Sequence, residues 1–109
     1  MKLEKIDHVV ITVKDLNKTV DFYTNILGMK LEKFSSSSNN NLIRYALSFG
    51  SQKINIHQEK KPLKPNALNP SSGSMDICFI SQNKINDWMH HLKKKELILK
   101  LDLRKKLVL

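Results

Sequence analysis

The chain has 109 residues, of which 40% are hydrophobic and 27% are charged, and its formal net charge is +9. This length and composition suit one compact domain and exclude a wholly disordered chain. No apolar run approaches the roughly 20 residues that a membrane span needs. The single cysteine, Cys78, cannot form an internal disulfide, and no C-x-x-C pair suggests a zinc ribbon. We therefore expect a cytoplasmic protein.

The positive charge is concentrated toward the carboxyl end. Residues 92–109 hold seven Lys or Arg against two acidic side chains and so carry +5 of the net charge. A basic tail of this kind suits nucleic acid or an acidic membrane surface. However, no aromatic residues alternate with the basic ones and no reading helix is evident. We therefore expect neither nucleic acid nor a membrane as a partner.

The first predicted elements are a strand and a helix. Residues 6–13 (IDHVVITV) are rich in β-branched side chains and predict a strand, whose alternation separates an apolar face from a mixed face that includes His8. An amphipathic helix is expected over 15–27, with Asp15 as its N-cap and apolar residues at helical spacing. Gly28 follows at the position where a helix often ends in a left-handed residue.

Three further strands are predicted before a linker, over residues 29–34, 42–49 and 53–58. The Ser/Asn-rich residues 35–41 predict a turn or loop, and Gly50-Ser51 suits a tight hairpin turn. In the last of these strands Ile54 and Ile56 share one face, whereas Asn55 and His57 share the other.

The second part of the chain starts the same element order again. Residues 59–73 contain all three prolines and predict a linker; residues 74–81 predict a strand, and a helix follows with Asn83 as a possible cap. Residues 97–103 suit either a strand or a helix. The predicted fold class is α+β, with paired βαβββ modules of which the second is incomplete. Within one domain over 1–109, we expect four parts: a first module (1–58), a linker (59–73), the start of a second module (74–95) and an atypical basic tail (96–109).

Three ionisable side chains occupy equivalent places in the predicted strands. His8, His57 and Asp76 each lie on the face opposite a run of apolar residues, so all three would line the concave side of a curved sheet. Two imidazoles and a carboxylate suit a divalent metal with open positions for water or substrate. The alternative is structural: a strand histidine often only bonds to backbone or water, and Asp76 follows Gly73-Ser74 as a strand-start residue would.

The remaining polar candidates are less informative. Arg44 lies on the mixed face of its strand, either as an anchor for a substrate carboxylate or as an edge charge that reaches water. His90 and His91 are adjacent on a predicted helix, so their side chains diverge by about 100°, and we expect them to be exposed or partly buried. We expect Cys78 to be a small buried hydrophobic residue. Dinucleotide, triphosphate and serine-hydrolase motifs are absent from the sequence.

Together these segments resemble the vicinal oxygen chelate superfamily, which includes glyoxalase I, bleomycin-resistance proteins and extradiol dioxygenases. The resemblance rests on IDHVVITV with DL at 15–16 and DFYTNILGM at 21–29. Two further stretches, FGSQKINIHQ at 49–58 and NPSSGSMDIC at 69–78, resemble its glyoxalase-domain-containing-protein-5-like group. The likeness extends over about residues 1–95.

The resemblance implies a cupped mixed sheet around a divalent metal that the substrate chelates through adjacent oxygen atoms. Metal ligands would come from the first and last strand of each module, here His8, His57 and Asp76, the last in place of a more usual histidine. It implies a metal-dependent lyase or dioxygenase acting on a small molecule, with iron, manganese, nickel and zinc all possible. The resemblance gives no catalytic residue beyond these ligands.

One expected ligand is missing from the sequence. The family has a glutamate in its last strand, after an Asp-Pro-Asp-Gly type of turn, and neither occurs here. We expect a reading frame that is truncated or frameshifted after about residue 95, with doubtful activity. An incomplete second module would leave a sheet edge and apolar surface uncovered, so we also expect a homodimer.

The alternative function is a metal-free binding protein of the bleomycin-resistance kind, which would hold a drug or metabolite in the same cup. The small number of aromatic residues on the predicted concave faces argues weakly against it.

Overall fold

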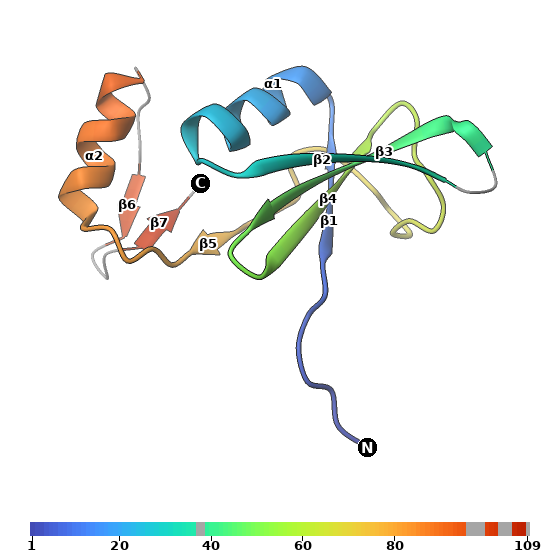
Figure 1. Cartoon of the computed structure of the whole chain (residues 1–109), viewed down its shortest axis with the longest axis horizontal. Helices are drawn as coiled ribbons and strands as arrows, with labels where there is room; N and C mark the ends of the chain where they lie inside the picture. Colours follow the sequence, from blue (N-terminus) through green and yellow to red (C-terminus); the bar gives the residue numbers. More distant parts are fainter. Residues whose placement is uncertain (37–38, 96–99, 103–105, 109) are drawn as a thin grey trace. The chain divides into compact units, whose positions relative to one another are not determined.

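The structure is a computed structural model that describes residues 1–36, 39–95, 100–102 and 106–108. Its elements follow in the order β1 (Val9–Val13), α1 (Leu16–Asp21), η1 (Phe22–Ile26), β2 (Lys30–Ser36), β3 (Asn39–Phe49), β4 (Gln52–Gln58), β5 (Cys78–Phe79), α2 (Ile85–Lys94), β6 (Lys100–Asp102) and β7 (Lys106–Val108) (Figure 1). The chain divides into two compact units, Met1–Ser74 and Met75–Leu109. The predicted α+β class is confirmed.

The first unit contains a four-stranded mixed sheet in the order β1-β4-β3-β2. β1 pairs with β4 in parallel, whereas β4 with β3 and β3 with β2 are antiparallel. Because β1 and β4 are parallel neighbours, the chain crosses over between them through the helix, β2 and β3. The unit therefore has the predicted β-α-β-β-β order.

The large core side chains of the central strands lie on one face of the sheet. The β1–β4 ladder pairs Ile11 with Ile56, and the β3–β4 ladder pairs Leu47 with Ile54. All four side chains are buried, and Leu47 is completely inaccessible. The alternation predicted from the sequence is thus confirmed for the central strands, and burying each such side chain contributes about 2 kcal/mol.

The helix after β1 begins and ends where the sequence predicts, but its winding changes. The Asp15 side chain accepts a hydrogen bond from the Lys18 backbone amide at 3.0 Å, and Gly28 has a left-handed φ of 77°. Between them, α1 passes into the π-helical η1, where the Leu27 backbone amide donates to the Phe22 carbonyl at 3.1 Å. Such wider turns are short and often occur near functional sites.

Two predicted boundaries in the first unit are corrected. The strand expected over 6–13 begins only at Val9, whose partner Ile54 is the first pair of the β1–β4 ladder. Of the segment 35–41, expected as a turn or loop, residues 35–36 end β2 and residues 39–41 begin β3, with an irregularity in register between Ser35 and Ser36; residues 37–38 lie outside the described residues. Pairing with a neighbouring strand satisfies the backbone groups even of a Ser/Asn-rich run, and composition alone does not reveal it.

The second unit contains α2 and a three-stranded antiparallel sheet in the order β5-β7-β6. The strand expected over 74–81 shrinks to Cys78–Phe79, because β7 pairs with only these two residues. The helix cap is Lys84, not Asn83, whose backbone amide instead donates to the Ser81 hydroxyl. Of the ambiguous segment 97–103, residues 100–102 form β6 and the rest lie outside the described residues.

None of the helices in the described part of the chain is both long enough and apolar enough to cross a membrane.

Candidate functional site

The candidate site lies on the face of the first sheet that is opposite its core. His57 pairs in register with Thr12 on β1, and Asn55 pairs with Val10 on β1 and Ala46 on β3. Because side chains alternate along a strand, Asn55 and His57 project to the same side of β4, away from Ile54 and Ile56. β4 lies between β1 and β3, so these two polar side chains stand near the middle of the sheet and not at an edge.

His57 is a buried imidazole with an unused ring nitrogen. Its side chain is 5% exposed, and its Nδ1 has no hydrogen-bond partner among the residues described. Burial lowers the pKa of His57 below its ordinary value of 6.5, and the positive charge of Arg44 lowers it further. The ring is therefore neutral at physiological pH, which is the form that binds a metal ion or accepts a hydrogen bond.

Arg44 supplies the positive charge next to His57. Tyr45 pairs with Ile56 in the antiparallel β3–β4 ladder. Because the two strands run in opposite directions, the residue before Tyr45, Arg44, is next to the residue after Ile56, His57. Its Nη2 donates to the Lys64 carbonyl oxygen at 3.1 Å, so the guanidinium is tied to the segment after β4. This one bond leaves other guanidinium donors of Arg44 for an anion, and its predicted substrate role stays a prediction.

His8 directly precedes β1 and is oriented by its neighbour. Its Nδ1 lies 2.7 Å from a carboxylate oxygen of Asp7, and this contact with His8 lowers the pKa of Asp7. When Nδ1 donates its proton to that carboxylate, Nε2 keeps a lone pair that can bind a metal. The His8 side chain is 39% exposed.

The strand register spaces the two predicted imidazole ligands along the sheet. Val9 pairs with Ile54 and Thr12 pairs with His57, so His8 and His57 stand four positions apart along the ladder. At a rise of about 3.3 Å per residue, this is roughly 13 Å along the strand direction. Asn55 lies between them; it is two residues before His57 on β4 and is therefore the next residue on the same face.

Asp76 belongs to the second unit and is exposed. It was expected within a strand, but it lies two residues before β5, whose described pairs with β7 are at Cys78 and Phe79. Over the described parts of the chain, no group of three or more His, Cys, Asp or Glu side chains is placed to hold a metal ion. The three-ligand set of His8, His57 and Asp76 therefore stays a prediction.

The exposure of the remaining candidates, Cys78, His90 and His91, can be compared with the prediction. Cys78, expected to be buried, is exposed, because β5 is a two-residue strand at the edge of its sheet. On α2, His90 is exposed and His91 is half-buried, both within the prediction; His91 packs edge-on against Trp88, with ring centroids 5.6 Å apart.

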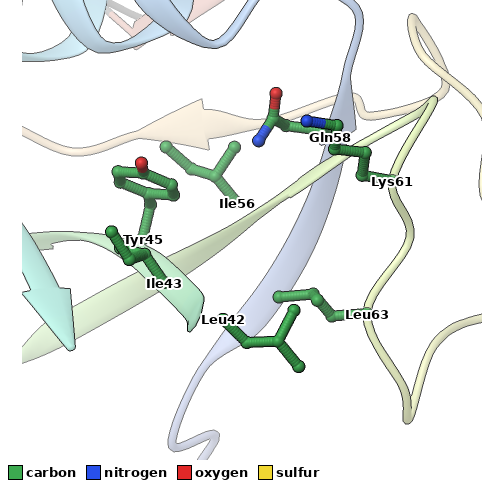
Figure 2. A pocket seen from close by; sticks show the side chains of 7 residues that line it. All are labelled: Leu42, Ile43, Tyr45, Ile56, Gln58, Lys61 and Leu63. Carbon is green, nitrogen blue, oxygen red and sulfur yellow. The ribbon is translucent and has the colours of Figure 1, made fainter. Parts of the chain in front are cut away.

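A pocket on the core side of the first sheet was not predicted. It encloses about 200 Å³ between the outer ends of β3 and β4 and the segment after β4 (Figure 2). Its walls are mostly apolar, with Tyr45, Gln58 and Lys61 adding polar groups; Leu42, Ile43, Ile56 and Leu63 complete the lining. Alternation does place Tyr45 and Ile56 on one face, but the sequence does not reveal where the following segment runs.

The comparison with known proteins agrees with this fold. Residues 5–97 match the Glyoxalase/Bleomycin resistance protein/Dioxygenase superfamily, and the chain belongs to this family. It is 45% identical over 93 residues to glyoxalase domain-containing protein RDO1 of Mycosarcoma maydis, covering 85% of this chain and 49% of that protein. It is 42% identical over 87 residues to virulence protein STM3117 of Salmonella typhimurium, covering 80% and 56%. The chain thus spans about half the length of these relatives.

Solved structures are similar to this chain in three dimensions as well. The integron cassette protein VCH_CASS1 from the mobile metagenome of V. cholerae superposes with a TM-score of 0.78 at 34% identity, over 99% of this chain and 84% of that one. The fosfomycin resistance protein FosX of Listeria monocytogenes shares only the fold. Its E126Q mutant, solved in complex with Mn(II), has a TM-score of 0.57 at 19% identity, with 91% and 77% covered.

Proposed function

We propose that this chain provides a divalent-metal site for a glyoxalase-type domain that acts on a small substrate through two adjacent oxygen atoms. Within the first unit, the proposed metal-binding residue is His57, which the register places about 13 Å from His8 along the strand direction. The reaction class would be that of a lyase or a dioxygenase, since this fold serves several chemistries.

His57 carries the proposal. A buried imidazole that is held neutral and leaves one ring nitrogen without a partner is unfavourable unless something binds there. A metal ion would use that lone pair and offset the cost of burial. The Mn(II) complex of FosX supports the choice of a divalent ion for this fold.

The other residues have distinct roles in this proposal. A bound divalent ion would supply Lewis-acid polarisation of the substrate's adjacent oxygens. Arg44 would bind a carboxylate or other anionic group of the substrate with the donors that do not reach the Lys64 carbonyl.

Direct metal titration tests the proposal. The purified chain is stripped with a chelator and titrated by calorimetry with Mn(II), Fe(II), Ni(II) and Zn(II), the iron under anaerobic conditions. We expect one ion per chain with saturable binding for at least one metal. Binding that is absent for all four ions, in a chain that remains folded by circular dichroism, would contradict the proposal.

A second candidate is a metal-free binding protein, which the lack of a three-ligand cluster among the described residues favours. In that case the neutral His57 would accept a hydrogen bond from the bound molecule instead of coordinating a metal. The same titration separates the two functions, because a metal-free binder would show no stoichiometric uptake.

A further inference from the structure

The pocket at the outer ends of β3 and β4 is distinct from the site around His57. Its lining residues all lie between Leu42 and Leu63, so it belongs entirely to the first unit. Tyr45 and Ile56, which pair across β3 and β4, both line it. Because side chains alternate along a strand, these two project to the face opposite that of His57. The pocket is therefore a second candidate site, for which no metal is needed.

The outer wall of the pocket is the segment after β4, which hydrogen bonds fix at both ends. The Lys61 backbone amide donates to the Gln58 carbonyl oxygen at 3.1 Å, which turns the chain back at the end of β4. Farther along, Arg44 Nη2 donates to the Lys64 carbonyl oxygen at 3.1 Å and ties the segment to β3. Leu63 lies between these two ties, so its place in the wall is set by the fold.

The size of the pocket limits what it can hold. Its volume is about 200 Å³. An apolar cavity of about 150 Å³ admits benzene, whereas drug-sized ligands need about 300 Å³ or more. The pocket therefore fits one ring with a small head group, and it is too small for a nucleotide or a peptide. At its mouth, Leu42 and Ile43 are 38% and 49% exposed, and an apolar ligand would cover them favourably.

The polar groups of the pocket are gathered toward one end. Figure 2 shows the Lys61 side chain extending toward the carboxamide of Gln58, whereas Leu42 and Leu63 lie at the other end. A ligand that matches this arrangement has an apolar body and one polar head. Both the ammonium and the carboxamide N–H₂ are hydrogen-bond donors, so the head must be an acceptor.

The charge of the lining favours an anion. Among the described residues that line the pocket, Lys61 is the only charged one, and its ammonium makes no ion pair within the described structure. A second cation lies nearby, because the Lys33 ammonium is 6.0 Å from the centroid of the Tyr45 ring. With one lysine in the lining, the site suits a single negative charge.

We propose that this pocket binds a small monocarboxylate whose apolar body is about the size of one ring, with the carboxylate paired to the Lys61 ammonium. The apolar body lies against Ile43, Ile56 and Leu63, and the Gln58 carboxamide donates a second hydrogen bond to the carboxylate. This site goes beyond the proposed function, because it uses neither His57 nor a metal ion.

Benzoate and benzamide test the site on the metal-free chain. The two probes have nearly the same shape, but only benzoate carries a negative charge. In a titration followed by the backbone amide signals in NMR, both should bind saturably and shift the signals of Tyr45 and Lys61. We expect the wild type to prefer benzoate by about fivefold, the worth of one exposed ion pair.

A pair of lysine variants isolates the role of charge. Lys61→Gln should lower the affinity for benzoate by about fivefold and leave that for benzamide unchanged. Lys60→Gln removes the same charge from the preceding exposed residue, which does not line the pocket, and should keep the preference. Equal affinities of the wild type for the two probes, or the same loss in both variants, would overturn the proposal.

A second pair of variants tests whether the probes occupy the pocket itself. Leu63→Trp fills the cavity and should abolish binding of both probes, whereas Leu68→Trp, at a site that is 95% exposed, should not. Circular dichroism checks that each variant is folded. A folded wild type that binds no benzoate would overturn the proposal. If that chain is also a dimer in sedimentation and Leu63→Trp makes it a monomer, a second copy covers the pocket instead.

Discussion

Thr12 on β1 and His57 on β4 are register partners in the one parallel ladder of the first sheet. This pairing puts the imidazole on the side of the sheet opposite Ile11 and Ile56, which are buried in the core. The face of a functional side chain is therefore set by the same alternation that builds the hydrophobic interior. A shift of one residue between β1 and β4 would disrupt both together.

The neutral state of His57 makes the stability of the chain depend on pH. Its folded pKa lies below the ordinary value of 6.5, so between these two values the unfolded chain binds more protons than the folded one. Stability should therefore be complete above pH 6.5, fall as the pH decreases below it, and level off once the folded pKa is passed. Urea unfolding at several pH values measures this slope, and His57→Gln should reduce it. An equally steep slope in the variant would assign the effect to other groups.

Arg44 should control the protonation of His57. Arg44→Gln removes the neighbouring positive charge, so the pKa of His57 should rise toward its ordinary value. An NMR titration of the imidazole protons measures this shift directly. Lys53→Gln, on the same strand as His57, is the control for a change in overall charge. A larger shift in the Lys53 variant than in the Arg44 variant would contradict the assignment.

Leu47 should be among the most sensitive positions of the core. It is fully buried and pairs with Ile54 and Leu31 on the two neighbouring strands. Leu47→Ala should lower the free energy of unfolding by about 3 kcal/mol through lost burial and a residual cavity. Leu68→Ala is the matched control, because Leu68 is 95% exposed, and it should change stability little. Similar losses in both variants would mean that Leu47 is not packed as described.

The cap of α1 offers a smaller, local test. Asp15 accepts a hydrogen bond from the Lys18 amide at 3.0 Å, and Asp15→Ala leaves that donor without its partner. The expected loss is about 1 kcal/mol in the free energy of unfolding. Asn17→Ala, two residues later and exposed, should have little effect or be slightly stabilising. A loss as large in Asn17→Ala would argue against a capping role.

The sequence predicts those features of the fold that depend on local pattern. Alternation identifies the shared face of Ile54 and Ile56, and residue chemistry identifies Asp15 and Gly28 as the ends of the helix. Features that depend on a partner strand are predicted poorly. β1 starts at Val9 and β5 shrinks to two residues, because a strand extends only as far as its neighbour pairs with it.

The candidate site shows the same division. The sequence places His57 and Asn55 on one face, but it does not show that Val10 and Ala46 flank Asn55 and leave its oxygen unpaired. It also does not show that Asp7 orients His8 or that Cys78 is exposed. These facts depend on which residues meet across strands and at chain ends, and a single sequence contains no direct record of such contacts.

Metal affinity of His57→Gln, compared with His90→Gln, tests the central claim most directly. Both substitutions remove one imidazole, but His57 is buried with a free ring nitrogen, whereas His90 is exposed on α2. In Mn(II) titrations followed by electron paramagnetic resonance, the His57 variant should lose affinity by about tenfold or more, and the His90 variant should match the wild type. Equal affinities of the wild type and His57→Gln would contradict the assignment of His57 as a metal ligand.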